Sequence, residues 1–194
     1  MRRNARVLPA LGSVQFRYPK RGCNRLLARN RNAGCLPYAY SGPSRRRAGT
    51  GRFAYLITET TATIGTYAVD PASGLLKELQ FIDTNEYKEQ PAASDIHVTP
   101  DGKFLYGAER RTSMLIGYKI DPDKGTLTQI GRFPTEKTPR GFAIDPRGNF
   151  LLSVGMDSAG MMVYSIDQAS GELKPIGQYP MGTQPNWIEI VDLK

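Results

Sequence analysis

The sequence predicts an all-β protein, a partial β-propeller with about three four-stranded antiparallel blades. The main observation is a strand-like segment that recurs along the chain. It begins at Gly51 with Gly-Arg-Phe-Ala-Tyr, returns at Gly102 and returns again at Gly148, so the offsets are 51 and then 46 residues. A turn motif and an inner-strand motif keep the same step. Repeats of about this length are typical of propeller blades.

Each block contains short segments with the composition of β-strands. In the first block, residues 53–58, 64–69 and 76–83 are rich in β-branched and aromatic side chains. The second block repeats the same series at residues 104–108, 115–120 and 127–133. No ten-residue stretch of the repeats has an apolar face at helical spacing, so we expect no helices there.

Two kinds of turn separate these segments. One begins at Asp70, Asp121 and Asp167, and each of these aspartates is followed four residues later by glycine. The aspartate caps the turn and the glycine supplies the positive φ angle. The other kind is Pro100-Asp-Gly and Pro146-Arg-Gly, which we expect to join the first and second strands of a blade.

The repeats divide the chain into blades at residues 51–93, 94–139 and 140–194. Propellers typically close with four to eight blades, so three blades cannot close a ring. The end blades would then expose apolar surface and strand edges. We therefore expect the chain to be part of a longer propeller or to self-associate through its exposed blade edges.

Residues 1–50 differ from the repeats in composition. They carry twelve Lys and Arg and no acid, whereas residues 51–194 carry fourteen Lys and Arg against eighteen acids. The segment is a disordered tail, a basic arm for nucleic acid, or sequence that is not native coding sequence. The repeats themselves give no charge-based reason to expect nucleic acid. Cys23 and Cys35 have no histidine beside them, so we expect no metal site.

Other segments indicate the compartment. No apolar run approaches the roughly 20 residues of a membrane span, and the N-terminus does not resemble a signal peptide. The repeats contain no cysteine and need no oxidising compartment. We expect a cytoplasmic protein that does not bind membranes.

The longest repeated motifs resemble a known family. The segments Ser94-Asp-Ile-His-Val-Thr-Pro-Asp-Gly and Thr138-Pro-Arg-Gly-Phe-Ala-Ile-Asp-Pro-Arg-Gly are similar to those of the seven-bladed propeller lactonases. That family includes bacterial 6-phosphogluconolactonases and fungal carboxymuconate-cyclising enzymes. The resemblance covers residues 51–194 and implies the C-terminal three blades, with residues 184–190 as the last strand. The family's Gly-Pro-Arg-His segment reads Gly42-Pro-Ser-Arg here, without the histidine.

The resemblance implies a site at one end of the central channel. It places Glu59 at an acidic pocket position, Arg110 at a pocket arginine, His97 on an inner strand and Arg140 near the channel mouth. Glu59, His97 and Arg110 are the candidate catalytic residues, and Arg110 and Arg140 the candidate substrate-binding residues. Lactone hydrolysis needs a base and a cation that stabilises the oxyanion, and phosphate is bound well by arginine.

Each of these residues also has a structural interpretation. Glu59 is also compatible with a solvated strand end, and Arg110, with Arg111, is compatible with an exposed loop pair. His97 is compatible with a structural histidine bonded between blades, and Arg140 with neutralisation of acidic neighbours across a blade junction. Asp95 is expected to pair with Arg140 or to hold a turn.

The family implies a hydrolase that opens a sugar-phosphate lactone, converting 6-phosphogluconolactone to 6-phosphogluconate in the pentose phosphate pathway, with no metal or cofactor. The main alternative is a non-enzymatic propeller interaction module, because a fold does not determine function. A Glu59–Arg110 pair that faces the channel would favour the enzyme. A third hypothesis makes residues 1–50 a nucleic-acid anchor. Because a propeller pocket draws on most blades, we expect this chain alone to have little or no activity.

Overall fold

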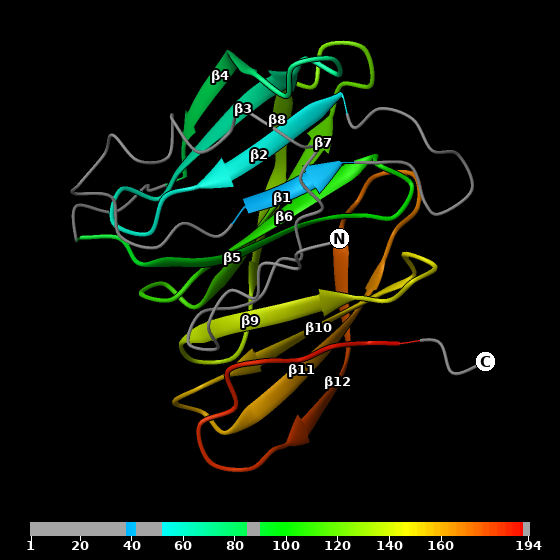
Figure 1. Cartoon of the computed structure of the whole chain (residues 1–194). Coiled ribbons are helices and arrows are strands. Elements are labelled where there is room, and N and C mark those ends of the chain that lie inside the picture. The colour runs from blue at the N-terminus through cyan, green and yellow to red at the C-terminus, as the bar shows by residue number, and fades with distance from the viewer. Residues whose placement is uncertain (1–37, 42–51, 85–89, 192–194) are drawn as a thin grey trace, which may run out of the picture.

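The computed structural model describes residues 38–41, 52–84 and 90–191. These residues form three four-stranded antiparallel sheets, which Figure 1 shows from one side. The twelve strands are β1 (Tyr38–Ser41), β2 (Phe53–Ile57), β3 (Thr63–Val69), β4 (Leu76–Asp83), β5 (Ala93–Val98), β6 (Phe104–Glu109), β7 (Met114–Ile120), β8 (Leu127–Pro134), β9 (Pro139–Ile144), β10 (Phe150–Gly155), β11 (Gly160–Ile166) and β12 (Leu173–Pro180). The predicted all-β partial propeller is confirmed. In the part of the chain that the structure describes, no helix is long and apolar enough to cross a membrane.

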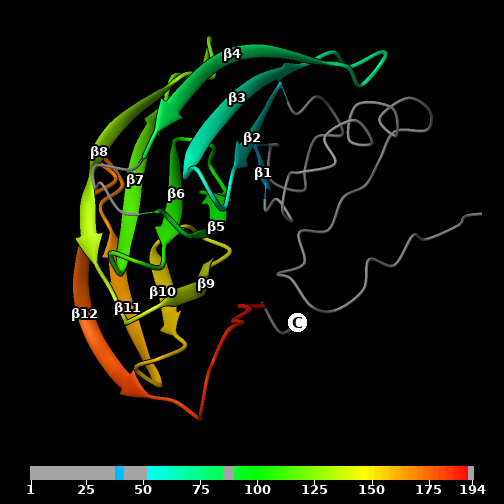
Figure 2. The same cartoon turned by 90° about the vertical axis from the view of Figure 1, so that its left-hand side faces the viewer.

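Each sheet is a simple meander in chain order. The orders are β1-β2-β3-β4, β5-β6-β7-β8 and β9-β10-β11-β12. Figure 2 shows β1, β5 and β9 on the inner, concave side and β4, β8 and β12 along the outer side. The sheets correspond to three propeller blades, which we call the first, second and third blade in chain order.

The first blade begins before the boundary that the sequence analysis placed at residue 51. Its inner strand is Tyr38–Ser41, which pairs with β2 so that Tyr38 lies opposite Leu56 and Ser41 opposite Phe53. Strand pairing is made by backbone groups, so a segment with an unusual composition can still supply a strand. The composition of residues 1–50 therefore gave no indication of β1. The rest of residues 1–50, including both cysteines, lies outside the described residues.

The predicted turns form as the sequence indicates. Asp70 Oδ1 accepts hydrogen bonds from the backbone N–H of Ala72 at 2.9 Å and of Ser73 at 2.7 Å. These bonds, led by that from the Ser73 N–H, lower the pKa of the Asp70 carboxyl from its ordinary value. Gly74 follows with φ +71°, and its N–H donates to the Asp70 carbonyl. The same turn recurs with Asp121 and Asp167, so local chemistry sets the spacing of the outer two strands.

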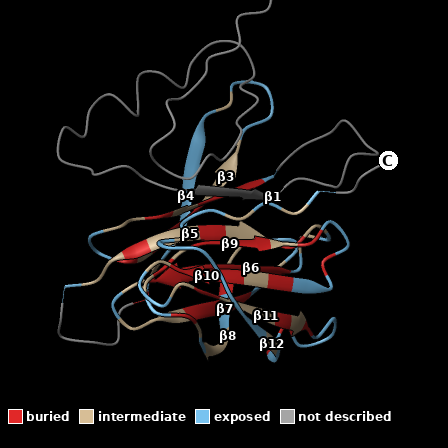
Figure 3. Ribbon diagram, turned by 90° about the horizontal axis from the view of Figure 1, so that it is seen from below, coloured by how far each residue is buried: buried red, intermediate tan, exposed pale blue. Residues whose placement is uncertain are grey.

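Apolar side chains fill the two junctions between blades. One cluster joins the first blade to the second through residues such as Tyr55, Ile64 and Leu105. A second cluster joins the second blade to the third through residues such as Tyr106 and Phe142. In Figure 3 buried residues predominate along β6, β7, β9 and β10, while much of β4 and β12 is exposed. Blade-to-blade packing therefore stabilises the fold.

The same close contact occurs at both junctions. The turn glycine of the following blade lies against the phenylalanine that begins β2 or β6 in the preceding blade. A Cβ atom at Gly125 would lie 2.3 Å from Phe53 Cδ1, so a side chain cannot fit there. The Tyr55 hydroxyl also donates a 2.9 Å hydrogen bond to the Gly125 carbonyl. The second junction repeats this arrangement with Gly171, Phe104 and Tyr106, at 2.5 Å and 2.7 Å.

Candidate active site

The loops that follow the second strand of each blade gather at one end of the sheets. They border a depression of about 410 Å³ together with the segments that lead into β5 and β9. Nine residues line it: Glu59, Thr60, Gln90, Pro91, Ala92, Arg110, Arg111, Thr138 and Asp157. All three blades contribute. The lining combines two acids with two arginines, which is a suitable composition for a polar ligand.

An ion pair between the first and second blades lies at this depression. The Arg110 guanidinium donates through Nη2 to Glu59 Oε1. Arg110 is also held by its Nε, which donates to the Ala92 carbonyl at 3.1 Å, and by its backbone N–H, which donates to the same carbonyl at 3.0 Å. Both side chains are partly buried, and Arg110 makes the further hydrogen bonds to Ala92. The Glu59–Arg110 pair is therefore held more firmly than an ion pair on the open surface. The structure thus brings two of the predicted site residues together.

Glu109, immediately before Arg110, organises this loop, and the sequence analysis did not single it out. Its buried carboxylate accepts hydrogen bonds from the backbone N–H of Ala92 at 2.7 Å, of Arg111 at 3.1 Å and of Thr112 at 2.7 Å. The Thr112 hydroxyl adds a fourth bond at 2.6 Å. Burial acts to raise the pKa of Glu109, but the bonds from Thr112, Ala92 and Arg111 outweigh it and lower the pKa.

Arg111, Asp157 and Thr138 also line the depression and are not among the site residues predicted from the sequence. Arg111 is exposed at the depression, beside the Glu59–Arg110 pair. The Thr138 hydroxyl donates a 2.5 Å hydrogen bond to Asp157 Oδ2 on the third blade. Arg111 and Asp157 occupy equivalent positions in their repeats, one residue beyond the position of Arg110. Aligning the loops of the three repeats would have identified both residues.

His97 lies between the inner strands of the second and third blades and does not line the depression. Its Nε2 is 3.1 Å from Asp95 Oδ2, and its ring meets the Phe142 ring edge-on at 4.7 Å between centroids. Asp95 Oδ2 also accepts a 3.1 Å hydrogen bond from the Phe142 N–H. Asp95 therefore connects β5 to β9, whereas the sequence analysis expected a partnership with Arg140 or a turn.

This cluster predicts a pH dependence of stability. Burial, the largest effect, lowers the pKa of His97, but the charge of Asp95 and its hydrogen bond prevail and raise it above the ordinary 6.5. The stabilisation is then fully present below pH 6.5 and lost as the pH rises through the raised pKa. We expect the melting temperature of the wild type, relative to that of His97→Gln, to fall across this range. An unchanged difference between pH 5 and pH 9, roughly two units either side of neutrality, would contradict this.

Arg140 lies on β9 but outside the depression lining. The β9–β10 register shifts between Val154 and Gly155, whose partners are Gly141 and Pro139, so Arg140 is the extra residue of a β-bulge. Ser94 is the extra residue of the equivalent bulge on β5, where its hydroxyl donates to the Pro139 carbonyl at 2.6 Å. The structure thus separates His97 and Arg140 from the depression that holds Glu59 and Arg110.

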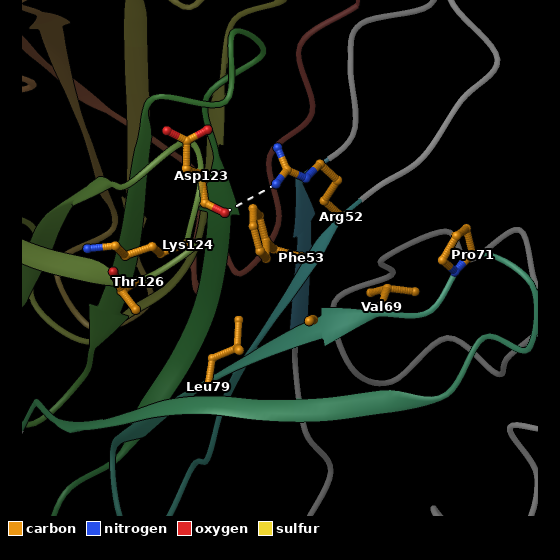
Figure 4. Close-up of a pocket in the computed structure, with 9 residues that line it drawn as sticks. Arg52, Phe53, Val69, Pro71, Leu79, Asp123, Lys124 and Thr126 are labelled. Atoms are coloured by element: carbon orange, nitrogen blue, oxygen red, sulfur yellow. Dashed lines mark hydrogen bonds between the residues drawn. The ribbon is translucent and has the colours of Figure 1, made fainter.

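A second hollow, of about 690 Å³, lies on the outside of the junction between the first and second blades. Figure 4 shows the residues that line it, among them Phe53, Leu79 and Lys124. Arg52 crosses its edge and donates to the Asp123 carbonyl at 3.2 Å, while its guanidinium lies 5.3 Å from the centre of the Phe53 ring. This hollow contains none of the predicted site residues.

Comparison with known proteins identifies relatives of this chain. The 6-phosphogluconolactonase of Pectobacterium carotovorum subsp. carotovorum (strain PC1) is 36% identical over 140 residues, which are 71% of this chain and 42% of the relative. The 6-phosphogluconolactonase of Pectobacterium atrosepticum is 42% identical over 96 residues, or 48% of this chain and 29% of the relative.

Solved structures give the same result. A protein of Bacteroides fragilis, provisionally named a 6-phosphogluconolactonase, superposes with a TM-score of 0.69 at 35% identity and covers 73% of this chain and 39% of its own. A periplasmic gluconolactonase of Pseudomonas aeruginosa superposes with a TM-score of 0.64 at 30% identity, over 69% of this chain and 38% of its own.

The chain spans well under half the length of these relatives. The family described as "Lactonase, 7-bladed beta-propeller" matches residues 39–190. The match therefore includes most of β1, upstream of residue 51, as well as all three blades. Sequence, fold and blade repeats agree, and the chain belongs to the seven-bladed β-propeller lactonase family.

Proposed function

We propose that this chain supplies part of the pocket of a cytoplasmic 6-phosphogluconolactonase-like hydrolase, which opens a sugar-phosphate lactone in the pentose phosphate pathway. The observation that carries the proposal is the Glu59–Arg110 ion pair at one depression, with Arg111 exposed beside it. An interaction module would not need an acid and a cation held together there. The relatives named as 6-phosphogluconolactonases support the substrate class.

In this proposal the depression residues divide the chemistry between them. Water attacks the lactone carbonyl carbon while Glu59 accepts its proton, and the developing oxyanion is stabilised by Arg110. The ring C–O bond then breaks, and the proton returns to the leaving oxygen, which becomes a hydroxyl group. The carboxylic acid formed from the carbonyl then releases its proton to water and becomes a carboxylate. Arg111 binds the phosphate, for which the planar guanidinium is well suited.

Assigning the base to Glu59 rather than His97 follows from position. Glu59 lines the depression together with Arg110, whereas His97 does not and is engaged by Asp95. A general base must come within hydrogen-bond reach of the attacking water. We therefore assign His97 a structural role at the junction between the second and third blades.

The proposal predicts that the chain binds the stable product, 6-phosphogluconate, through Arg111. Replacing Arg111 by alanine removes a charged hydrogen-bond donor, so we expect the dissociation constant from isothermal titration calorimetry to rise roughly tenfold or more. Arg147→Ala is the matched control, because Arg147 is exposed and paired only loosely with Asp145, at 3.7 Å, in a turn outside the depression. Equal losses in both variants would indicate non-specific charge attraction and contradict the proposal.

We also expect the purified chain to hydrolyse 6-phosphogluconolactone slowly or not at all. The depression is built from three blades, whereas the family has seven, and the chain spans 42% of the Pectobacterium carotovorum relative. Acid release by the chain should therefore match the spontaneous rate. Rapid hydrolysis that disappears in Glu59→Ala would show that three blades suffice.

A further inference from the structure

We propose that Asp157, held in place by Thr138, is a specificity-determining residue of the depression and accepts hydrogen bonds from the hydroxyl groups of a sugar lactone. The ligand class is a polyhydroxylated lactone, or the open-chain acid that it forms. This inference rests on the proposed function, because Asp157 and Thr138 line the same depression as Glu59 and Arg110. It adds the group that selects among lactones of the same charge.

One position of the repeated loop reaches the depression from every blade. In each blade the residue immediately before the third strand has a positive φ angle: Ala62, Ser113 and Ala159. The residue two positions earlier lines the depression in each case: Thr60, Arg111 and Asp157. The loops repeat, but these side chains carry a hydroxyl, a guanidinium and a carboxylate. The fold therefore presents different recognition chemistries to one ligand from equivalent positions.

Asp157 is attached to the segment that leads into β9. The Thr138 hydroxyl donates to Asp157 Oδ2 at 2.5 Å. The backbone N–H of Asp157 donates to the Lys137 carbonyl at 3.3 Å, and that of Met156 donates to the Thr138 carbonyl at 3.1 Å. Within the part of the chain that the structure describes, Oδ2 thus has a donor, and Oδ1 is left to accept hydrogen bonds from a ligand.

Thr138 has an unusual backbone conformation at this place. Its φ is +57°, in the left-handed region, which is uncommon for a β-branched residue. Its N–H donates to the Ser113 hydroxyl at 3.4 Å and its carbonyl accepts from Met156, so neighbours on both sides maintain this conformation. Strained backbone of this kind clusters at ligand-binding sites. The residue that accepts the equivalent bond in the second blade, from the Arg110 N–H, is Ala92, which has no hydroxyl.

A carboxylate at this place favours hydroxyl groups over other groups of a ligand. An ionised carboxylate only accepts hydrogen bonds, so it pairs with hydroxyl donors and repels a phosphate or a second carboxylate. Arg110 and Arg111 have the opposite preference. In this arrangement the arginines bind the anionic groups of the ligand, and Asp157 binds the hydroxylated carbons between those groups. A site built to bond a hydroxyl rejects an analogue that lacks it.

Two ligands of equal charge test the role of Asp157. One is 6-phosphogluconate, and the other is the phosphate ester of 6-hydroxyhexanoate, which has the same terminal groups and chain length but none of the hydroxyls between them. In isothermal titration calorimetry, the parent chain should bind 6-phosphogluconate roughly tenfold or more tightly than the ester. Asp157→Ala should raise the dissociation constant of 6-phosphogluconate by about this factor and should not raise that of the ester.

Three further variants identify the cause of any loss. Asp123→Ala removes the same charge from an exposed turn outside the depression and should change neither dissociation constant. Thr138→Val keeps the branched shape but removes the hydroxyl, so it should reduce the preference for 6-phosphogluconate, whereas Thr138→Ser keeps the hydroxyl and should retain it. Arg111→Ala should weaken both ligands alike, because both carry a phosphate.

The outcomes separate this inference from the proposed function. Equal losses of both ligands in Asp157→Ala, an Asp123→Ala chain that behaves like Asp157→Ala, or a parent chain that does not distinguish the ligands would overturn the role of Asp157. The proposed function would stand in these cases if Arg111→Ala still weakened both ligands. A parent chain that binds neither ligand would overturn the proposed function and the role of Asp157 together.

Discussion

Replacing Phe104 by alanine should lower the free energy of unfolding by about 3–5 kcal/mol, the range for a fully buried aromatic residue. Phe104 begins β6, is buried in the cluster between the second and third blades, and fills the turn at Gly171. Its loss leaves a cavity where two blades meet. Because native domains are stable by about 5–15 kcal/mol, chemical denaturation should show a marked shift of the midpoint.

The matched control is Phe150→Ala. Phe150 occupies the equivalent position in the third blade but is partly exposed, so its removal should cost about 1 kcal/mol or less when measured on the monomer. The two variants have the same substitution at the same position of the strand. They differ in that Phe104 packs against the following blade, whereas no following blade covers Phe150 in the described part of the chain. Equal losses in the two variants would mean that blade-to-blade packing is not the main source of stability.

Replacing Glu109 by alanine should cost about 2–4 kcal/mol and also weaken binding of 6-phosphogluconate. The substitution leaves the N–H groups of Ala92, Arg111 and Thr112 without their acceptor, and hydrogen bonds to charged groups are each worth about 1.5–3 kcal/mol. Glu109 does not line the depression, so any loss of binding would come from the altered positions of Arg110 and Arg111.

The pH dependence of this loss is a further check on its cause. The pKa of Glu109 is lowered in the folded chain, so its contribution is fully present above the ordinary value of 4.5 and is lost as the pH falls through the lowered pKa. The difference in the free energy of unfolding between the wild type and Glu109→Ala should therefore become smaller as the pH falls below 4.5. Glu109→Gln keeps one acceptor oxygen and should show an intermediate loss. A Gln variant as unstable as the Ala variant would indicate that the charge itself is essential.

The fold was largely predictable because it is encoded in local, repeated chemistry. The turns at Asp70, Asp121 and Asp167 need an acceptor at the first position and a positive φ at the fifth, and both requirements are visible in the sequence. The inner strand β1 was not predictable from the sequence. It is held by backbone pairing with β2, which requires no particular amino-acid composition of the strand. The blade boundary at residue 51 was drawn from the first copy of the repeated segment, which in the structure leads into β2, the second strand of its blade.

The site was predictable only in part. Resemblance to a family identified Glu59 and Arg110, and the structure brings them into contact. It also named His97 and Arg140, which the folded chain places outside the depression. Glu109 was not predicted from the sequence because its role depends on the backbone N–H groups that surround it in the fold. The neighbours of a glutamate in the sequence do not show whether its carboxylate is buried.

Amide NMR during a titration with 6-phosphogluconate shows whether the depression at Glu59 and Arg110 binds the sugar-phosphate product. The shifted amides should cluster at Ala92, Arg110, Arg111 and Thr138, which line that depression. The outer hollow at Phe53 and Lys124 provides an internal comparison in the same spectrum. Shifts confined to the outer hollow, or no saturable shifts, would contradict the assignment of this depression as a lactonase site.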